Sequence, residues 1–569
     1  MLNTCLLAVL VAALIGVGEG SISLEPLSTV YLPWEFNNDG TLDYDLDKGA
    51  AEQVAYHPGQ KMVYAVGVKG LLTVVDLTVP TAARVIHTQE LPNAQMGKYN
   101  DLALCGDNVA VIQSDPLDPL PGTLYIYGIY NGFSDLTLNQ QLQVGSAPSS
   151  VKFTSDCTRL VVVNEGKDGY DQNGNFKNPA GTISVVDFDI ENVATGGSLA
   201  VHTVNFLRFD HLQDEYGARG VRWVYRGEGT GTQGRMSEEL EPEDFTFDEN
   251  GGKIYVTLQE NNAIAVVDLI TLTVEDIYPL GAKNWADYML DPSDKDGGIR
   301  MQNWPIFGLY QPDDVVFFTA GSHKFLATAN EGNSRELTIG GVDISDEWRG
   351  TDFVTNNAIA QTVPLTFMAA LLDEAQLGVL RFSNYDGKSA SNPDQYEQFY
   401  TFGGRGFSLW NADNLTQFWD SGADVELKHS QHLPLIFNCE FDNDNPSKSP
   451  MDEMDEASKK KGPETESLTV AEVYGKTVII IGNERPSSIM IYSVDAVTGI
   501  PSFESIYRAG DISKDYDDAY RDRDIGDVDP ENLQFVPANE SPDGTPLLLV
   551  VGNISGTVSV YRVVDSNEV

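Results

Sequence analysis

The sequence predicts an all-β protein: a seven-bladed β-propeller, closed by an N-terminal strand and carrying long loop insertions. A phrase of short strands and Gly/Asp turns recurs from residue 50 onward, most clearly at Pro242–Leu269, Pro148–Phe188 and Pro530–Val563. Repeats of this size cannot bury a face alone, so they must stack. No helical period separates the strands, and four strands fit each repeat.

The repeats follow one another along the chain. Their first strands begin at equivalent positions, which are Glu52, Asn100, Ser149, Glu243, Asp313, Glu466 and Glu531. The first repeat has strands at Glu52–His57, Met62–Val68 and Leu71–Leu77, and a fourth around Ala83–Leu91. The third is interrupted at Lys167–Ala180, and the fifth resumes only at Gly403–Trp410.

The seventh repeat ends with its third strand, Gly556–Val563, and has no fourth. We expect Ser28–Phe36 to supply it, because an open sheet edge must otherwise be protected. Residues 21–569 are then one propeller domain, with insertions at about 210–241, 281–311, 334–402 and 423–465.

The composition is strongly acidic. In 569 residues, 84 acidic and 36 basic side chains give a net charge of −48, which argues against a nucleic-acid partner. The 41% hydrophobic content is that of a globular protein. The acidity indicates either solubility or cation binding, and the composition leaves both open.

Residues 1–20 are predicted to be a signal peptide. The apolar run Leu6–Val17 is too short to span a membrane, and small residues follow it. The C-terminus has no hydrophobic tail, so we expect neither a membrane span nor a lipid anchor. The expected location is extracellular, in a matrix or shell.

Three cysteines remain after the predicted signal. Cys105 and Cys157 occupy the same turn of consecutive repeats, which predicts a disulfide between them and leaves the state of Cys439 open. The sequons at Asn414 and Asn553 are predicted glycosylation sites, whereas a following proline weakens the one at Asn539.

Carboxylates are predicted to converge at one mouth of the propeller channel. First strands descend from that face and second strands return to it, so both contribute acids. The predicted metal ligands are Glu52, Glu243, Asp313, Glu466, Glu531, Glu165, Glu260, Glu331 and Glu484. An oxygen-rich set of this kind suits Ca²⁺. The alternative is ion pairing with Arg335 and Arg485, next to two of these positions.

Other acids lie in the insertions. Asp291–Gly298 and Asp168–Asn175 alternate Asp or Asn with Gly turns, which suits oxygen coordination, but neither fits an EF-hand. Glu440–Glu456 is more densely acidic and is interpreted as solvated surface. The sequence contains no recognised nucleophile–base motif or phosphate-binding loop.

Several phrases resemble those of the mesenchyme-specific cell-surface glycoproteins of biomineralising animals and of the related bacterial choice-of-anchor I propeller domain. They include YVTLQENNAIAVVDL, RMQNWPIFGLYQPD, TANEGNSRE and FGGRGFSLW. The resemblance covers about Leu24 to Val563. It implies a surface or secreted glycoprotein linked to calcium-carbonate skeleton or shell formation, and it implies no catalytic residues.

Two main functions follow. The first is a non-catalytic matrix glycoprotein that binds Ca²⁺, calcium carbonate mineral or matrix proteins. The second is a propeller hydrolase, phosphatase-like or lactonase-like, with a metal at the channel mouth. A pure protein-binding platform fits the same observations.

Overall fold

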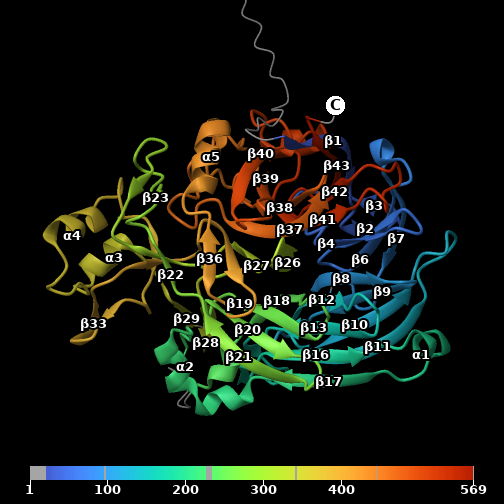
Figure 1. Cartoon of the computed structure of the whole chain (residues 1–569), viewed down its shortest axis with the longest axis horizontal. Helices are drawn as coiled ribbons and strands as arrows, with labels where there is room; N and C mark the ends of the chain where they lie inside the picture. Colours follow the sequence, from blue (N-terminus) through green and yellow to red (C-terminus); the bar gives the residue numbers. More distant parts are fainter. Residues whose placement is uncertain are drawn as a thin grey trace, which may run out of the picture.

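The computed structural model describes residues 21–567 apart from 95, 97, 226–233, 340–341 and 444, so the predicted signal peptide lies outside the described residues. The chain is all-β. Within these described residues, seven four-stranded antiparallel sheets follow one another around a common centre (Figure 1). The innermost strand of each sheet contacts that of the next, and β41 of the last contacts β4 of the first.

Each sheet runs outward from a strand at the centre to a strand at the rim. In that order, the first three sheets are β4 (Gln53–His57), β5 (Met62–Val66), β6 (Leu71–Asp76) and β7 (Arg84–Glu90); β8 (Tyr99–Cys105), β9 (Asn108–Gln113), β10 (Pro121–Gly128) and β11 (Leu138–Ser146); and β12 (Pro148–Phe153), β13 (Arg159–Asn164), β16 (Thr182–Asp187) and β17 (Ala200–Asn205). The fourth and fifth are β18 (Pro242–Phe247), β19 (Lys253–Leu258), β20 (Ala263–Asp268) and β21 (Thr273–Pro279); and β26 (Val315–Ala320), β27 (His323–Asn330), β35 (Gly406–Asn411) and β36 (Gln417–Asp420). The last two are β37 (Thr465–Val473), β38 (Lys476–Asn483), β39 (Ser488–Val494) and β40 (Pro501–Tyr507); and β41 (Pro530–Val536), β42 (Leu547–Gly552), β43 (Thr557–Asp565) and β1 (Ile22–Tyr31).

An N-terminal strand completes the last sheet, as the sequence predicts, but its predicted bounds are wrong. β1 pairs with β43 from Ile22 opposite Asp565 to Tyr31 opposite Thr557. The predicted strand Ser28–Phe36 overlaps only the end of β1. Its own end, β2 (Glu35–Phe36), instead pairs with β3 (Leu42–Asp43).

The hydrophobic core is divided among the spaces between sheets. Within the described residues, one apolar cluster lies between each pair of consecutive sheets. The cluster that includes Val63 and Val75 of the first sheet with Leu547 and Val560 of the last joins the two ends of the series. Second strands are covered on both faces, which explains their nearly continuous apolar sequences.

The innermost strands are also joined by polar side chains. Four of these side chains in the described chain accept a hydrogen bond from a backbone N–H of the next sheet: Asp101 from Val151 at 2.6 Å, Thr246 from Phe317 at 3.0 Å, Asp314 from Leu468 at 2.8 Å and Gln534 from Tyr56 at 2.8 Å. The Gln534 bond links the last sheet to the first. These bonds satisfy backbone groups at an edge that no further strand covers.

The remaining elements connect the sheets. The helices are α1 (Ile190–Thr195), α2 (Gln213–Arg219), α3 (Gly350–Thr355), α4 (Leu365–Leu372), α5 (Asp424–His432), α6 (Tyr516–Arg521) and the 3₁₀ turns η1 (Pro80–Ala82), η2 (Leu207–His211), η3 (Met236–Glu238) and η4 (Pro434–Ile436). The short strands are β14 (Gly169–Tyr170), β15 (Phe176–Lys177), β22 (Ala282–Asn284), β23 (Met289–Leu290), β24 (Gln302–Asn303), β25 (Phe307–Leu309), β28 (Glu336–Ile339), β29 (Val342–Ser345), β30 (Glu347–Arg349), β31 (Arg381–Ser383), β32 (Lys388–Ser389), β33 (Asn392–Tyr396) and β34 (Tyr400–Thr401). None of the described helices has the length and apolar character needed to cross a bilayer.

Two of the insertions build a lobe with its own core. Trp285 and Ile306 from one insertion pack with Phe353, Leu371 and Phe399 from another. Figure 1 shows their elements, among them α3, α4, β23 and β33, together at one side of the sheets. These segments are therefore packed structure, whereas the sequence predicts loops.

Cys105 and Cys157 form the predicted disulfide, with Cα atoms 5.9 Å apart. The bond ties β8 to the turn that follows β12. Cys439 is a buried free cysteine.

We predict that replacing Cys105 and Cys157 together by Ser lowers the melting temperature. The disulfide joins residues 52 apart in sequence, and losing a constraint of that length costs on the order of 2–4 kcal/mol. Thermal unfolding of the wild type under oxidising and reducing conditions provides the control, since the reduced wild type should match the variant. Equal melting temperatures for the variant and the oxidised wild type would contradict the prediction.

Candidate metal centre at the central cavity

The seven innermost strands surround a cavity of about 870 Å³. Its lining includes residues from six of the seven sheets and, beside the fifth, the two residues just before β26. Most lining residues belong to the innermost strands or the residues just before them. The strands begin at one end of the cavity, so their first side chains meet there. Those side chains are mainly acidic, which makes this end the candidate site.

Five of the nine predicted ligands line the cavity: Glu52, Glu165, Glu243, Asp313 and Glu531. The other four lie close to them. Asp313, Glu331 and Glu466 each offer an oxygen, and these three oxygens lie within 4.8 Å of one another. The same holds for Glu331, Glu464 and Glu484. Glu260 adds a negative charge beside Glu243.

Some of these carboxylates are neutralised by side chains. Lys461 pairs with Glu331 and, at 3.5 Å, with Glu464. Arg485 pairs with Glu484 and, at 3.9 Å, with Glu464. The group formed by Glu331, Glu464 and Glu484 is therefore an internal ion-pair network.

The predicted pairing of Arg335 with this ring is wrong. Arg335 instead contacts Asp168 at 3.0 Å, Glu239 at 3.3 Å and Glu241 at 3.0 Å. Glu239 and Glu241 belong to the segment before β18, which the repeat pattern does not cover. They draw the guanidinium away from Glu331.

Glu243, Asp313 and Glu466 are the ring acids that have neither an ion pair nor, unlike Glu52, Glu260 and Glu531, an amide donor in the described chain. In the part of the chain that the structure describes, no hydrogen bond or ion pair joins these three carboxylates to a partner. Burial, reinforced by neighbouring carboxylates, raises the pKa of all three well above the ordinary value. Burial and Asp529 likewise raise the pKa of Glu52 to about 8.

A second layer of acids lies one residue further along the strands. Asp101, Asp244 and Asp314 line the same cavity, and Lys152 pairs with Asp244 at 2.7 Å. Burial raises the pKa of Asp101 to about 7 and, with Asp244, that of Asp314 to about 8.

Sequence reasoning missed this layer. Each of these acids directly follows a predicted ring position. The doublets Asn-Asp, Glu-Asp and Asp-Asp at the start of first strands could therefore have predicted the second layer. No comparable sequence pattern marks the lysines that line the cavity, which are Lys98, Lys152 and Lys167.

The two predicted glycosylation sites have different surroundings. Asn414 lies exposed on the turn before β36. Asn553 lies within the acidic ring, where its amide donates to Glu52 at 3.0 Å and to Glu531 at 3.4 Å. A glycan on Asn553 would have to replace both bonds, so Asn414 is the accessible acceptor of the two.

The group of Asp313, Glu331 and Glu466, in which Lys461 forms an ion pair with Glu331 and with neither of the other two described carboxylates, fits a hard divalent cation. Ca²⁺ binds oxygen at about 2.3–2.6 Å, so two of its ligand oxygens are at most about 5 Å apart. The 4.8 Å limit within this group meets that condition. A cation there would offset the cost of placing like charges together with little solvent.

Two curated proteins are similar in sequence. The chain is 32% identical over 389 residues to the mesenchyme-specific cell surface glycoprotein of Strongylocentrotus purpuratus, covering 65% of this chain and 46% of that protein. It is 35% identical over 191 residues to Gigasin-3a of Magallana gigas, covering 33% of this chain and 66% of that protein. The chain therefore spans less than two thirds of the length of either relative.

Solved structures give weaker likenesses. The WD40 domain of Neurospora crassa Pan2 has a TM-score of 0.42 at 9% identity, with 96% of each chain covered. The β-propeller domain of Myceliophteria thermophila Cps50 (Swd1) has a TM-score of 0.39 at 7% identity, covering 90% of this chain and 96% of that one. TM-scores of this size carry no information about function.

The family model of the choice-of-anchor I domain matches residues 52–497, which is more than half of the chain and includes six of the seven innermost strands. By this match, the chain belongs to the choice-of-anchor I domain family.

Proposed function

We propose that this protein is a secreted, non-catalytic glycoprotein of a calcium-carbonate skeleton or shell matrix, and that it binds Ca²⁺. In this proposal the seven sheets are the blades of one closed propeller, and the cation lies at the acidic end of its cavity. The observation that carries the proposal is the incompletely neutralised group Asp313, Glu331 and Glu466, with Glu243 nearby.

Several findings support the extracellular setting. One relative is named a cell surface glycoprotein. The disulfide Cys105–Cys157 is of a kind that persists in oxidising compartments, and Asn414 offers an exposed sequon. The mineral context comes from the resemblance to the mesenchyme-specific glycoproteins, and the net charge of −48 suits contact with calcium ions or a calcium mineral.

We predict that Asp313→Asn combined with Glu466→Gln removes the stabilisation by Ca²⁺ at this site. A Kd of about 0.1–1 mM, typical of extracellular calcium modules, would give the wild type about 1.4–2.7 kcal/mol at about 10 mM Ca²⁺. In EDTA the variant should be at least as stable as the wild type, because it lacks two buried carboxyl groups that have no partner in the described chain. Melting temperatures measured in EDTA and in Ca²⁺ test both statements.

Glu484→Gln is the matched control. It removes one carboxylate of the same ring, but one that Arg485 already neutralises. It should therefore lower the melting temperature equally with and without Ca²⁺. The calcium proposal fails if the double variant keeps the full Ca²⁺ shift of the wild type.

We also predict that, without Ca²⁺, stability decreases as the pH rises from about 6.5 to 8.5. The pKa of Glu52 and that of Asp314 are raised to about 8, from ordinary values of 4.5 and 3.8. The folded protein therefore holds protons that the unfolded chain has already released, and raising the pH removes them at a cost in stability. Buried His429, whose pKa burial lowers to about 3, has no further effect above its ordinary pKa of 6.5.

Thermal unfolding in EDTA across this pH range measures the effect. Added Ca²⁺ should raise the melting temperature more at pH 8.5 than at pH 6.5, because the cation needs ionised carboxylates. A melting temperature that rises with pH in EDTA would contradict the assignment of raised pKa values to this cavity.

The hydrolase remains a second candidate, and one observation favours it. The cavity holds carboxyl groups whose pKa values are near neutral, Asp101 at about 7 and Glu52 at about 8, as general acids and bases require. Purified protein should be assayed on phosphoesters and lactones with Ca²⁺ or Mn²⁺. Turnover that Glu52→Gln abolishes would favour the enzyme over the matrix protein, and we expect none.

A further inference from the structure

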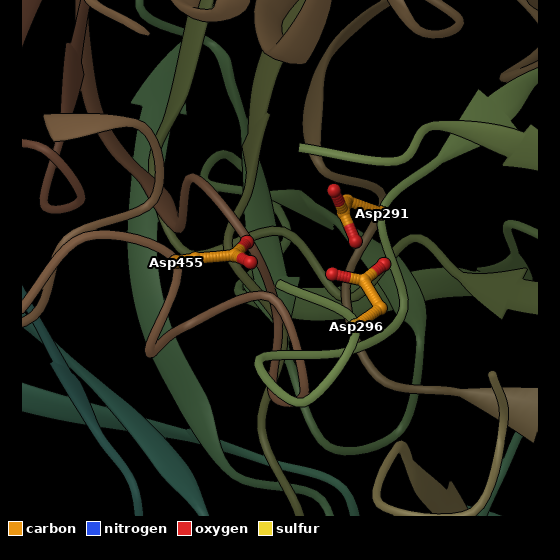
Figure 2. A group of neighbouring side chains, drawn as sticks. All are labelled: Asp291, Asp296 and Asp455. Carbon is orange, nitrogen blue, oxygen red and sulfur yellow. The ribbon is translucent and has the colours of Figure 1, made fainter. Parts of the chain in front are cut away.

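Three aspartates from two insertions converge away from the central cavity. Asp291 and Asp296 lie on the segment that follows β23, and Asp455 lies between η4 and β37. Each offers an oxygen, and the three oxygens lie within 4.8 Å of one another. Figure 2 shows the three carboxylates pointing toward one another from the two segments. All three residues are buried, with exposed fractions of 0%, 7% and 3%.

Local hydrogen bonds fix this arrangement. The Asp291 carboxylate accepts from the backbone N–H of Arg300, and that of Asp296 accepts from Gly298 at 3.2 Å. Asp455 Oδ1 accepts from the Ser458 hydroxyl at 2.6 Å.

The buried guanidinium of Arg405 joins the two segments. It donates to the backbone oxygen of Asp291 at 2.8 Å and to that of Ser458 at 2.7 Å. These bonds involve backbone oxygens, so they hold the segments together without neutralising the three carboxylates.

Neighbouring side chains form no ion pair with these aspartates in the described chain, although the charge of Arg300 acts on Asp296 at longer range. Asp294, in the same loop, is paired with Lys295 and with Lys459 at 2.7 Å. No ion pair of this kind reaches Asp291, Asp296 or Asp455 among the residues that the structure describes. Within this loop, Asp294 is therefore paired with lysines, whereas Asp291 and Asp296 have no ion pair in the described chain.

Asp455 provides a second, independent sign of a missing ligand. Its Oδ2 is buried and has no hydrogen-bond partner within the described chain, although the residue is only 3% exposed. Its carboxylate is directed at Asp291 and Asp296 (Figure 2). A buried carboxylate oxygen without a donor is costly, and proteins normally satisfy such atoms. Burial also raises the pKa of Asp291 to about 7 and that of Asp455 to about 8.

We propose that Asp291, Asp296 and Asp455 bind a Ca²⁺ ion that fastens these two insertions to each other. Oxygens within 4.8 Å of one another can share one ion at the usual Ca²⁺–oxygen distances of about 2.4 Å. Backbone carbonyls and water complete its six to eight ligands. Mg²⁺ is disfavoured because it requires near-ideal octahedral geometry, whereas these ligands come from two irregular segments.

This site goes beyond the proposed function and stands without it. A calcium ion here has a structural role, because it links loops that no shared sheet holds. It uses none of the residues of the central cavity, so either site can exist without the other.

Asp455→Asn tests the proposal, with Asp294→Asn as the matched control from the same cluster of loops. Calcium-free protein should be titrated with Ca²⁺ alone, and bound ions counted by native mass spectrometry. We expect Asp455→Asn to bind one Ca²⁺ fewer per chain than the wild type, and Asp294→Asn to keep the wild-type number. The central variant with Asp313→Asn and Glu466→Gln should retain this ion.

Hydrogen exchange gives a readout that does not depend on the total number of ions. Ca²⁺ should slow exchange in residues 289–301 and 452–462 of the wild type and of Asp294→Asn, but not of Asp455→Asn. If Asp455→Asn fails to fold, Asp296→Asn must give the same loss, because Asp296 is the most exposed of the three. Unchanged stoichiometry in a folded variant, or no calcium-dependent protection of these segments in the wild type, overturns the proposal.

Discussion

The architecture depends on how the innermost edge of each sheet is satisfied. Each of these strands has backbone groups that no neighbouring strand covers, and they face a narrow shared space. Side chains of the adjacent sheet supply the missing bonds, as Asp101 does for Val151 and Gln534 for Tyr56. Polar residues are therefore required around the centre whatever the protein binds. Only acids beyond this requirement, such as Glu243 and Glu466, point to a ligand.

The repeat pattern predicted the features that recur in every sheet. The starts of innermost strands at Glu243 and Glu531 lie within a residue of the observed strands, and the equivalence of Cys105 and Cys157 predicted their disulfide. The N-terminal strand was misplaced because its pairing depends on its partner β43, and two adjacent segments have strand-like sequences. Periodicity cannot choose between two such segments when neither belongs to a repeat.

Features outside the repeats could not be predicted from the repeat pattern. Lys461 neutralises Glu331, yet it lies in an insertion whose path no pattern specifies. Arg335 was expected at the ring because it is close to Glu331 in sequence, but Glu239 and Glu241 bind it elsewhere. The approach of Asp455 to Asp291, across 164 residues of chain, was equally hidden, although each lies in or beside an acidic stretch visible in the sequence.

The pairing of β1 with β43 also constrains how the chain is made. Ile22 and Asp565 are nearly the first and last residues of the described chain, yet they are neighbours in one sheet. During synthesis β1 emerges long before β43, and it has no partner in the last sheet until β43 has left the ribosome. Throughout that interval it is an open β-edge beside six sheets that can already form, which exposes it to pairing with other chains. Production of this protein therefore places a demand on chaperones before β43 is made, because the last sheet is completed by a strand that precedes the other six sheets in the chain.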